Sequence, residues 1–427
     1  MRNLFCLVLP LVTAHAWGAV ITVTSLDDDT NTNGEVTLRE AILAAETDLS
    51  VDGSAAGSGA DTIVFDPGLT AAGDPTISLE LYESGEAGPS AFVITSPLTI
   101  AGASGEQGIR LAGSTNNDFR LFHVRTGAVL RLSWLNLTGG SATGTVGQGG
   151  AILNEGTSRL THCAIYSNRA VTVGGGPARG GAIHNAAGDL GLENSTLSGN
   201  TAVGGDALGA AIYSSNGFAG LTNCTIATNV CMATTNGTAL GHGMFALAAD
   251  DFPVYYLFNN IFFDGMGGTH DFYGTHVGVA FLSAVGDGNM VESHSGLFAG
   301  VVAGDPGLLA LADNGGPTLT HALPPGSPAI NAGFFFLPAD STDQRGAYYP
   351  RYVDGGRSGI WQVDIGAFEV SELDFGDAPT ATNGYTYATL RADSGPAHAL
   401  RSGLALGRAV DAEADGQPAL LADGDDI

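Results

Sequence analysis

Apolar and polar positions in the middle of this 427-residue chain follow a pattern that recurs about every thirty residues. Each copy places Leu first, an apolar residue sixth and Asn or Gly ninth, and the copies begin at Leu132, Leu160, Leu192, Leu221 and, in a more degenerate form, Leu257. A second motif keeps the same period, with GGAI, GGAI, GAAI and GHGM beginning at Gly149, Gly180, Gly209 and Gly241. Two landmarks that share one period predict a stacked repeat fold.

The segments that join these landmarks predict short strands and turns rather than helices. They are rich in Gly, Ser, Thr and Asn, and their apolar residues lie two positions apart. The first, fourth and sixth residues of a copy can all point inward only if the chain bends near the third. We therefore expect a corner near His162 and an interior containing Leu160, Cys163 and Ile165. One repeat is then one coil of a right-handed parallel β-helix, an all-β solenoid similar to that of pectin lyases, with equivalent side chains stacked at roughly 4.8 Å.

Asparagines recur at equivalent places in successive copies. Asn154 and Asn185 follow the GGAI motifs, and Asn168, Asn200 and Asn229 end the motifs that begin with Leu. Because Asn side chains hydrogen-bond backbone groups in turns, we expect these residues to bond the backbone between neighbouring coils.

Composition and charge fit an extracellular solenoid and argue against nucleic acid as a partner. The chain has 64 Gly and 44% hydrophobic residues, which is enough for a core that grows coil by coil. Its formal net charge is -28, and a surface of that sign repels phosphate backbones and anionic lipids. Such a surface leaves many carboxylates available to divalent cations, so calcium is the cofactor to consider.

The N-terminus has the pattern of a secretory signal. Arg2 is followed by an apolar stretch over residues 4–12 and an A-x-A cleavage site at residues 14–16, so residues 1–16 are expected to be removed. The apolar stretch is too short for a permanent anchor, and no later segment resembles a transmembrane helix. We therefore expect a secreted or cell-surface protein whose mature chain has no integral membrane segment.

Three cysteines remain after removal of the signal, namely Cys163, Cys224 and Cys231. Cys163 and Cys224 occupy the same position in copies that lie two coils apart, roughly 10 Å, which is beyond disulfide reach. We expect buried, reduced thiols, with a bridge between Cys224 and Cys231 only if the chain doubles back sharply.

Residues 21–46, with the sequence ITVTSLDDDTNTNGEVTLREAILAAE, and GSGADTIVF from Gly57 resemble a module of known proteins. The module stands at the N-terminus of secreted bacterial β-helix proteins and carries the motif C-S-L-R-E-A-I. Val36 and Thr37 stand where that motif has Cys and Ser, and Ser54 falls near a second cysteine of the family. The local disulfide that the resemblance implies therefore lacks its cysteines here.

The second half of this segment, residues 37–46, predicts an amphipathic helix. Its apolar residues fall on one face and are Leu38, Ala41, Ile42 and Ala45. We expect this helix to lie over the open end of the first coil and to shield its unpaired strand edges.

The loop before the helix fits two alternative roles. With the carbonyl of Glu35 as a further ligand, the calcium-loop pattern D-x-[DN]-x-[DN]-G-x5-E is matched by Asp29, Asn31, Asn33, Gly34 and Glu40. Alternatively, Thr37 and Glu40 form a capping box, which would occupy the Glu40 carboxylate. No helix precedes the loop, which favours the cap and leaves calcium as the alternative.

Two C-terminal segments resemble modules of exported bacterial proteins. Residues 305–369, with DNGGPTLTHALPPGSPAINAG, TDQRG and VDIGAFE, are similar to the C-terminal region of choice-of-anchor proteins, and their turn formers predict a closing region at the far end of the solenoid. From residue 373, DFGDAP and VDAEADGQPALLADGDD resemble a short acidic module, in which Asp411, Glu413 and Asp415 begin like a calcium loop that lacks its final carboxylate. The expected domains are residues 1–16 (signal), 17–110 (cap and first coils), 111–300 (regular coils), 301–370 (closing region) and 371–427 (acidic module).

Polysaccharide lyases and glycoside hydrolases also use this fold, and they need clustered carboxylates or a facing carboxylate pair. The acids of the regular coils do not fall at equivalent positions and so cannot stack into a cluster; they are Glu155, Asp189, Glu193 and Asp206. Arg159, Arg169 and Arg179 are regularly spaced and are expected on outward faces or in turns. The best acid-base constellation lies near the last coils and comprises His242, Asp250, Asp251, Asp264, His270 and Asp271.

An outward stripe follows the first strand of each coil and comprises His123, Leu153, His184, Tyr213 and Phe245. Flat stripes of this kind can bind sugar chains by stacking, unless a loop or the acidic module covers them. The sequence therefore predicts a secreted, non-enzymatic, adhesin-like β-helix of the cell surface or matrix, with a glycan or a surface protein as partner along one face. A polysaccharide lyase or glycoside hydrolase on the same fold is the alternative.

Overall fold

The computed structural model describes residues 18–370, except 72, 74, 104–107, 235, 249–253, 278–282, 296–299, 335–341 and 354–361, and a few short segments between residues 373 and 399. The expected signal, residues 1–16, lies outside the described residues. The acidic calcium-loop residues Asp411, Glu413 and Asp415 lie outside them as well.

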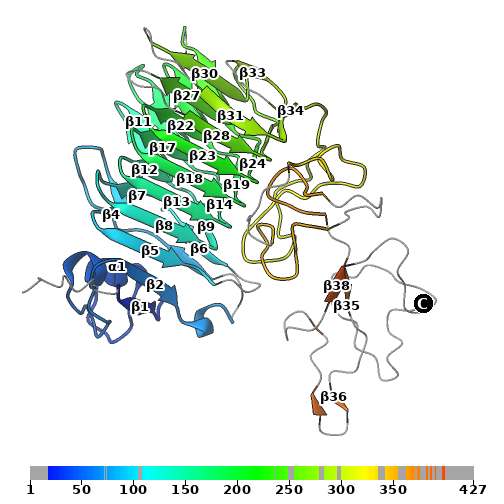
Figure 1. Ribbon diagram of the computed structural model, residues 1–427. Coiled ribbons are helices and arrows are strands. Elements are labelled where there is room, and N and C mark those ends of the chain that lie inside the picture. Colours follow the sequence, from blue (N-terminus) through cyan, green and yellow to red (C-terminus); the bar gives the residue numbers. More distant parts are fainter. Residues whose placement is uncertain are drawn as a thin grey trace, which may run out of the picture.

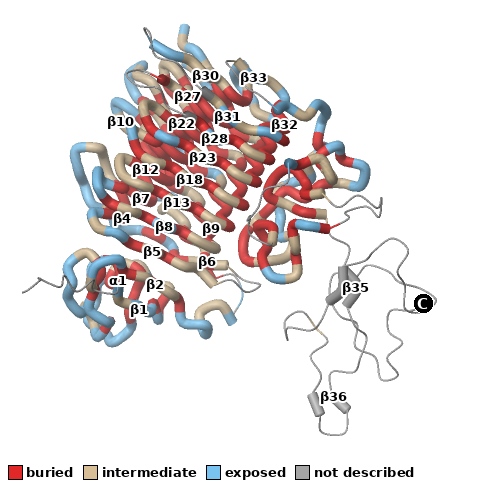
Figure 2. Tube along the Cα trace, viewed as in Figure 1, coloured by how far each residue is buried: buried red, intermediate tan, exposed pale blue. Residues whose placement is uncertain are grey.

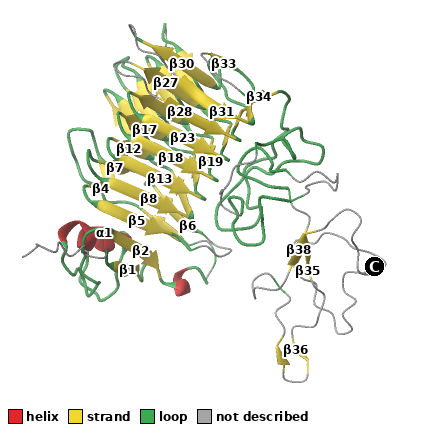
Figure 3. Ribbon diagram, viewed as in Figure 1, coloured by secondary structure: helices red, strands yellow, loops and turns green. Residues whose placement is uncertain are grey.

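The described chain winds into a parallel β-solenoid, which confirms the predicted fold class (Figures 1 and 3). Sheet A consists of β1 (Val20–Val23), β2 (Asp61–Phe65), β5 (Pro97–Ala101), β8 (Val129–Ser133), β13 (Thr157–Thr161), β18 (Asp189–Glu193), β23 (Phe218–Thr222), β28 (Val254–Phe258) and β31 (Ser283–Asp287). Sheet B consists of β3 (Thr76–Ser78), β6 (Ile109–Ala112), β9 (Leu135–Thr138), β14 (Ala164–Tyr166), β19 (Thr196–Ser198), β24 (Thr225–Ala227), β29 (Ile261–Phe263), β32 (Asn289–Val291) and β34 (Val301–Val302). Sheet C consists of β4 (Ser90–Ile94), β7 (Arg120–Val124), β12 (Ile152–Asn154), β17 (Ile183–Ala186), β22 (Ile212–Ser215), β27 (Met244–Ala248), β30 (Phe272–His276) and β33 (His294–Ser295).

The middle coils carry two additional short strands between sheet B and sheet C. Sheet D consists of β10 (Ser141–Gly144), β15 (Arg169–Thr172), β20 (Thr201–Gly204) and β25 (Val230–Ala233). Sheet E consists of β11 (Gly147–Gln148), β16 (Ala178–Arg179), β21 (Ala207–Leu208) and β26 (Ala239–Leu240). Beyond residue 370, two antiparallel pairs are β35 (Leu373–Phe375) with β38 (Ala397–Ala399), and β36 (Ala381–Thr382) with β37 (Tyr385–Thr386).

A left-handed corner separates sheet A from sheet B in each regular coil. His162 has a φ of 54°, and φ lies between 44° and 57° at the equivalent residues Trp134, Asn194, Asn223 and Asn259. Asn tolerates this conformation better than most residues, which explains its repeated use there. Leu160, Cys163 and Ile165 are 0–1% exposed, so the predicted interior and the predicted corner are both confirmed.

The repeated glycine motif marks the turn that joins sheet E to sheet C in each middle coil. Gly149, Gly180 and Gly209 have φ between 59° and 64°. A Cβ on any of them would lie 2.1 Å from the carbonyl oxygen of the residue three positions later. Only glycine fits this turn, which accounts for the second landmark of the repeat.

Stacked asparagines take the predicted place between coils. Asn200 Oδ1 accepts hydrogen bonds from the backbone N–H and the Nδ2 of Asn168, at 3.0 and 3.1 Å. Asn229 bonds Asn200 in the same way, at 3.0 Å for both contacts, and Asn154 Nδ2 donates to Asn185 Oδ1 at 2.7 Å. All five side chains are 0–1% exposed, so the ladder satisfies polar groups inside the solenoid.

Helix α1 (Leu38–Thr47) lies at the N-terminal end of the stack, as predicted (Figure 1). It packs against β1, β2 and β4, and its buried face includes the predicted residues Leu38, Ala41, Ile42 and Ala45. β1 is the edge strand of sheet A, so the helix shields the end of the sheet at which pairing stops. Within the described part of the chain, no helix is both long enough and apolar enough to cross a membrane.

The three cysteines are free and buried, which confirms the prediction for Cys163, Cys224 and Cys231. Burial raises the pKa of each thiol to about 12. The thiols therefore act as small apolar side chains, and the described fold contains no bridge between them.

The described parts of residues 305–370 pack along the side of sheet B, which corrects the prediction that this segment closes the far end of the solenoid (Figures 1 and 2). Asn136 Nδ2 in β9 donates to the carbonyl of Pro317 at 3.0 Å, and Thr196 Oγ1 in β19 donates to Gln344 at 2.6 Å. Farther along, Thr225 in β24 accepts the backbone N–H of Ala367 at 2.9 Å. The physical reason is that sheet B presents buried polar groups on its outward side, and these groups need partners.

Buried charges hold this lateral segment together. Arg345 Nη2 donates to Asp343 Oδ2 at 2.6 Å, and both oxygens of Asp364 accept backbone N–H groups, at 2.6 and 2.7 Å. Glu369 Oε2 accepts the backbone N–H of Asp364 at 2.9 Å. Desolvation raises the pKa of Asp364 to about 7 and holds the pKa of Glu369 well above its usual value. The TDQRG and DIGAFE motifs are thus parts of one buried network.

Candidate functional site

The N-terminal loop ends in a capping box, as the sequence favoured. The backbone N–H of Glu40 donates to Thr37 Oγ1 at 3.2 Å, and the backbone N–H of Thr37 donates to Glu40 Oε2 at 2.9 Å. The Glu40 residue is 1% exposed. Its carboxylate therefore serves the start of α1.

The other predicted calcium ligands form local turns. Asp29 Oδ1 accepts the backbone N–H of Asn31 at 3.0 Å, and Asn33 Oδ1 accepts that of Glu35 at 2.8 Å. Asp52 Oδ2 accepts the backbone N–H of Asn33, at 3.0 Å. Among the described residues, no group of three His, Cys, Asp or Glu side chains is placed to hold a metal ion. Calcium binding by this loop stays a prediction.

The predicted stripe is present as a registered ladder on the outward side of sheet C. His123, Leu153, His184, Tyr213 and Phe245 are successive partners in the strand register. The ring centroids of His184 and Tyr213 are 5.0 Å apart, and the Tyr213 and Phe245 rings stack at 5.2 Å with an interplanar angle of 7°. Tyr273, the next partner, extends the ladder by stacking on Phe245 at 5.4 Å.

The ladder is buried, which corrects the prediction of an open ligand face. Its five predicted members are only 2–6% exposed. Arg179, in β16, lies over the Tyr213 ring, with its Cζ 5.4 Å from the ring centroid. Its side chain therefore covers the ladder at this point. Burial also lowers the pKa of His184 to about 3. A sugar chain cannot stack on these rings in this arrangement.

His242 and Asp271 are the two residues of the predicted acid-base constellation that the structure brings close. His242 Nδ1 lies 3.8 Å from Asp271 Oδ1, and both residues are buried. His242 Nε2 accepts the backbone N–H of Gly268 at 2.8 Å, and Asp271 Oδ2 accepts the hydroxyl of Ser293 at 3.0 Å. These contacts hold the neighbouring loops in place. Because both side chains are buried, we interpret the pair as structural.

Of the remaining members, Asp264 and His270 lie beside this pair without sharing its contacts, and the others are undescribed. Asp264 is exposed, and His270 stacks on Tyr273 with ring centroids 5.9 Å apart. Asp250 and Asp251 lie outside the described residues.

The acids of the regular coils bind different partners. Glu155 Oε2 lies 3.0 Å from His123 Nε2, and Asp206 Oδ1 accepts the hydroxyl of Thr238 at 2.7 Å. Asp189, on sheet A, pairs with Arg159. These carboxylates belong to separate parts of the surface rather than to one groove.

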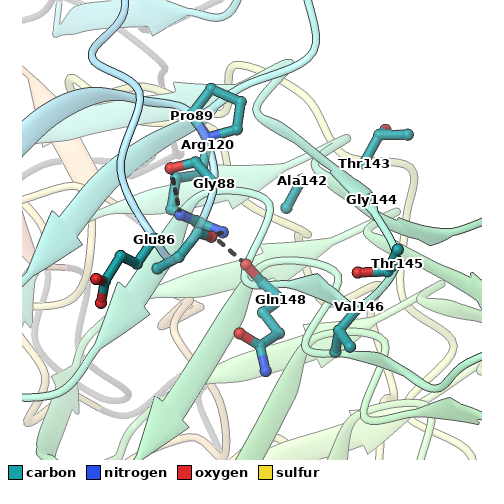
Figure 4. Close-up of a pocket in the computed structure, with 11 residues that line it drawn as sticks. Glu86, Gly88, Pro89, Arg120, Ala142, Thr143, Gly144, Thr145, Val146 and Gln148 are labelled. Atoms are coloured by element: carbon teal, nitrogen blue, oxygen red, sulfur yellow. Dashed lines mark hydrogen bonds between the residues drawn. The ribbon is translucent and has the colours of Figure 1, made fainter.

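A polar pocket of about 320 Å³ lies between residues 86–89 and the strands β10 and β11 (Figure 4). Arg120 lines it and donates to the carbonyls of Ala87, at 2.7 Å, and Gln148, at 3.3 Å. It also donates to Ser90 Oγ at 3.1 Å, and its burial lowers its pKa to about 10. The guanidinium therefore holds the surrounding chain in place.

An exposed band crosses the outward face of sheet A. Its middle column places Arg159, Gly191, Gly220 and Tyr256 in register on successive strands. A Cβ on Gly191 would lie 2.6 Å from Arg159 Cδ, and a Cβ on Gly220 would lie 3.3 Å from the ring of Phe218. The two glycines therefore let these long side chains lie flat on the sheet. The centroids of the Phe218 and Tyr256 rings are 5.5 Å apart, and these residues are 38% and 42% exposed.

Sequence reasoning missed this band, although a signal for it was present. In FAGLT and DLGLE, Gly occupies the outward position just before the repeated Leu, and Phe218 lies outward two residues earlier. Alternation around the buried Leu221 marks Phe218 as an outward aromatic residue. Arg159 and Arg169 are partly or fully exposed, as predicted.

Comparisons with known proteins add no relative. No protein-family model matches the chain. No curated protein and no solved structure matches it either. The site is therefore interpreted from its own geometry.

Proposed function

We propose that this chain is an exported, non-enzymatic β-helix protein of the bacterial cell surface or extracellular matrix, which acts like an adhesin by binding along one face. The observation that carries the proposal is the outward face of sheet A, where Phe218 and Tyr256 remain exposed on strands held in register. Large aromatic rings that stay exposed on a rigid surface are typical of interaction sites.

Export is supported by sequence features. Residues 1–16 have the pattern of a secretory signal. Residues 21–46 resemble the CSLREAI-type module, and residues 305–369 resemble the choice-of-anchor region. Both resemblances are to exported bacterial proteins.

Binding without catalysis is supported by how the polar groups are used. His242 and Asp271 are buried among backbone and hydroxyl partners. Asp189, beside the exposed band, is engaged by Arg159 at 2.6 Å. An acid-base mechanism needs a group that reaches the bond to be broken, whereas stacking needs only the exposed rings.

A polysaccharide panel tests the proposal. The mature protein, residues 17–427, is incubated with neutral and acidic polysaccharides, and both co-sedimentation and new reducing or unsaturated ends are measured. We expect retention on a polysaccharide without new chain ends. Chain ends that disappear in Asp250→Ala and Asp251→Ala variants would instead establish a lyase or hydrolase. Fractionation of cells that express residues 1–427 tests export. If the protein is exported, it should be found outside the cytoplasm.

A further inference from the structure

We infer that the band of Arg159, Gly191, Phe218, Gly220 and Tyr256 binds a neutral polysaccharide that runs along the solenoid axis. The inference rests on the proposed binding function and names its site and ligand class.

The two aromatic rings suit the repeat of a sugar chain. Phe218 and Tyr256 lie on adjacent strands of sheet A, and their ring planes are tilted by 45° with centroids separated by 5.5 Å, about the length of one hexose residue. Successive coils stack along the axis, so consecutive sugars of a chain that follows the axis can each meet one ring. Aromatic faces bind the apolar faces of sugar rings, which present C–H groups to the π-system.

Polar groups flank the two rings on the outward face of sheet A. The ion pair between Arg159 Nη2 and Asp189 Oδ2 spans 2.6 Å, and its side chains are 37% and 42% exposed. On the opposite side of the band, Glu193 and Thr222 are register partners at the last outward positions of β18 and β23. These side chains provide both donors and acceptors, as sugar hydroxyls require.

The charge of this face selects a neutral polymer. Arg131 and Arg159 on the face are outnumbered by Asp189, Glu193 and Asp287, and the whole chain has a formal charge of -28. An acidic polysaccharide would meet overall repulsion and find no excess of cations on the band. A neutral polysaccharide avoids that repulsion and keeps the stacking contacts.

The width of the apolar surface favours a linear polymer over a protein. Among the described residues of β23, β28 and β31, the exposed large apolar residues are Phe218, Tyr256 and Val285, and the half-buried Phe258 lies beside their row on β28. A stable protein partner needs about 800 Å² from each surface with a desolvated centre, which is broader than such a row. A linear glycan needs only the row itself.

Gly220 is a positioning residue in this account. Its missing side chain allows the Phe218 ring to lie across the sheet. Gly220→Ala would place a methyl group 3.3 Å from the ring and lift it, while the extended backbone accepts Ala. The variant therefore changes ring placement without removing an aromatic side chain.

Affinity electrophoresis of residues 17–427 in gels that contain hydroxyethyl cellulose, a soluble neutral β-glucan, tests the site. We expect Phe218→Ala and Tyr256→Ala each to weaken binding about tenfold, and Gly220→Ala to weaken it less. The matched control is Tyr82→Ala, because Tyr82 is 46% exposed and stacks on Phe119 at 5.4 Å but lies outside sheet A. This control should bind as the wild type does, and thermal melting verifies that each variant is folded.

Two results would overturn the inference. If the wild type is retarded and folded Phe218→Ala, Tyr256→Ala and Gly220→Ala bind equally well, the band is not the site, although the proposed binding function stands. If the wild type is not retarded by the neutral glucan, the ligand class is wrong. The proposed function itself fails only if the wild type binds no member of the polysaccharide panel and no surface protein.

Discussion

The side chains of Asn168 and Asn200, on neighbouring coils, are joined through one shared acceptor. Asn200 Oδ1 accepts the backbone N–H of Asn168 at 3.0 Å and its Nδ2 at 3.1 Å. Asn200 Nδ2 in turn donates to the carbonyl of Ile165 at 2.9 Å. Both residues are buried, so the ladder holds the coil spacing on which the flat outward face of sheet A depends.

Asn200→Ala should therefore destabilise the solenoid strongly. The substitution leaves the backbone N–H of Asn168 and the carbonyl of Ile165 buried without their partner, at a cost on the order of 3 kcal/mol in the free energy of unfolding. Urea unfolding followed by circular dichroism measures the loss. Asn117→Ala, at an exposed position, is the control and should change stability by less than about 0.5 kcal/mol. Equal midpoints for the two variants would contradict the ladder.

His184→Leu should reduce the acid sensitivity of folding. Burial lowers the pKa of His184 from 6.5 to about 3. Between these two pH values, His184 is therefore protonated in the unfolded chain and neutral in the folded chain. Stability from this group is present above pH 6.5 and is lost as the pH falls toward 3, by on the order of a few kcal/mol. Melting temperatures measured between pH 7 and pH 4 should fall less steeply in the variant. An unchanged slope would show that the imidazole is not kept neutral by the ladder.

Glu369→Gln should reduce the loss of stability that occurs as the pH rises. Burial and the neighbouring Asp364 raise the pKa of Glu369, so its contribution to stability is present below pH 4.5 and is lost as the pH rises through the higher folded value. A glutamine can still accept the backbone N–H of Asp364 at 2.9 Å and carries no titrating proton. We expect the urea midpoint of the wild type to fall between pH 5 and pH 8, and the variant to show a smaller fall. A larger fall in the variant would contradict the assignment.

Glu40 substitutions separate the cap from the calcium site. Glu40→Gln keeps an acceptor for the backbone N–H of Thr37 and should leave stability nearly unchanged, whereas Glu40→Ala should cost about 1 kcal/mol. Calorimetric titration with Ca²⁺ supplies the second readout. If the loop only caps the helix, the wild type and Asp29→Ala should give the same heat. Loss of a binding heat in Asp29→Ala would show that the loop holds calcium.

The sequence predicted which residues stack but not what packs outside them. The period and the alternation place His184 and Tyr213 on one outward column, and the structure agrees. Their burial depends on Arg179, from a two-residue strand directly before the repeated glycine motif, and the motif does not reveal that this side chain packs over the column. Local patterns define faces, and non-local packing decides whether a face is open.

The same limit explains why the position of residues 305–370 beside sheet B was not predicted. Turn formers in residues 305–369 were recognisable, but their docking depends on single contacts between distant residues, such as Gln344 with Thr196, which are 148 positions apart. The capping box of Thr37 and Glu40 was predictable because both residues lie within one turn of helix.

The central claim is that the outward face of sheet A binds a neutral polysaccharide without cleaving it. Size-exclusion chromatography of residues 17–427 with hydroxyethyl cellulose measures binding and polymer length together. The predicted result is co-elution of the wild type with polymer of unchanged length, and separate elution of folded Phe218→Ala. Shortened polymer, or co-elution of Phe218→Ala equal to that of the wild type, would contradict the claim.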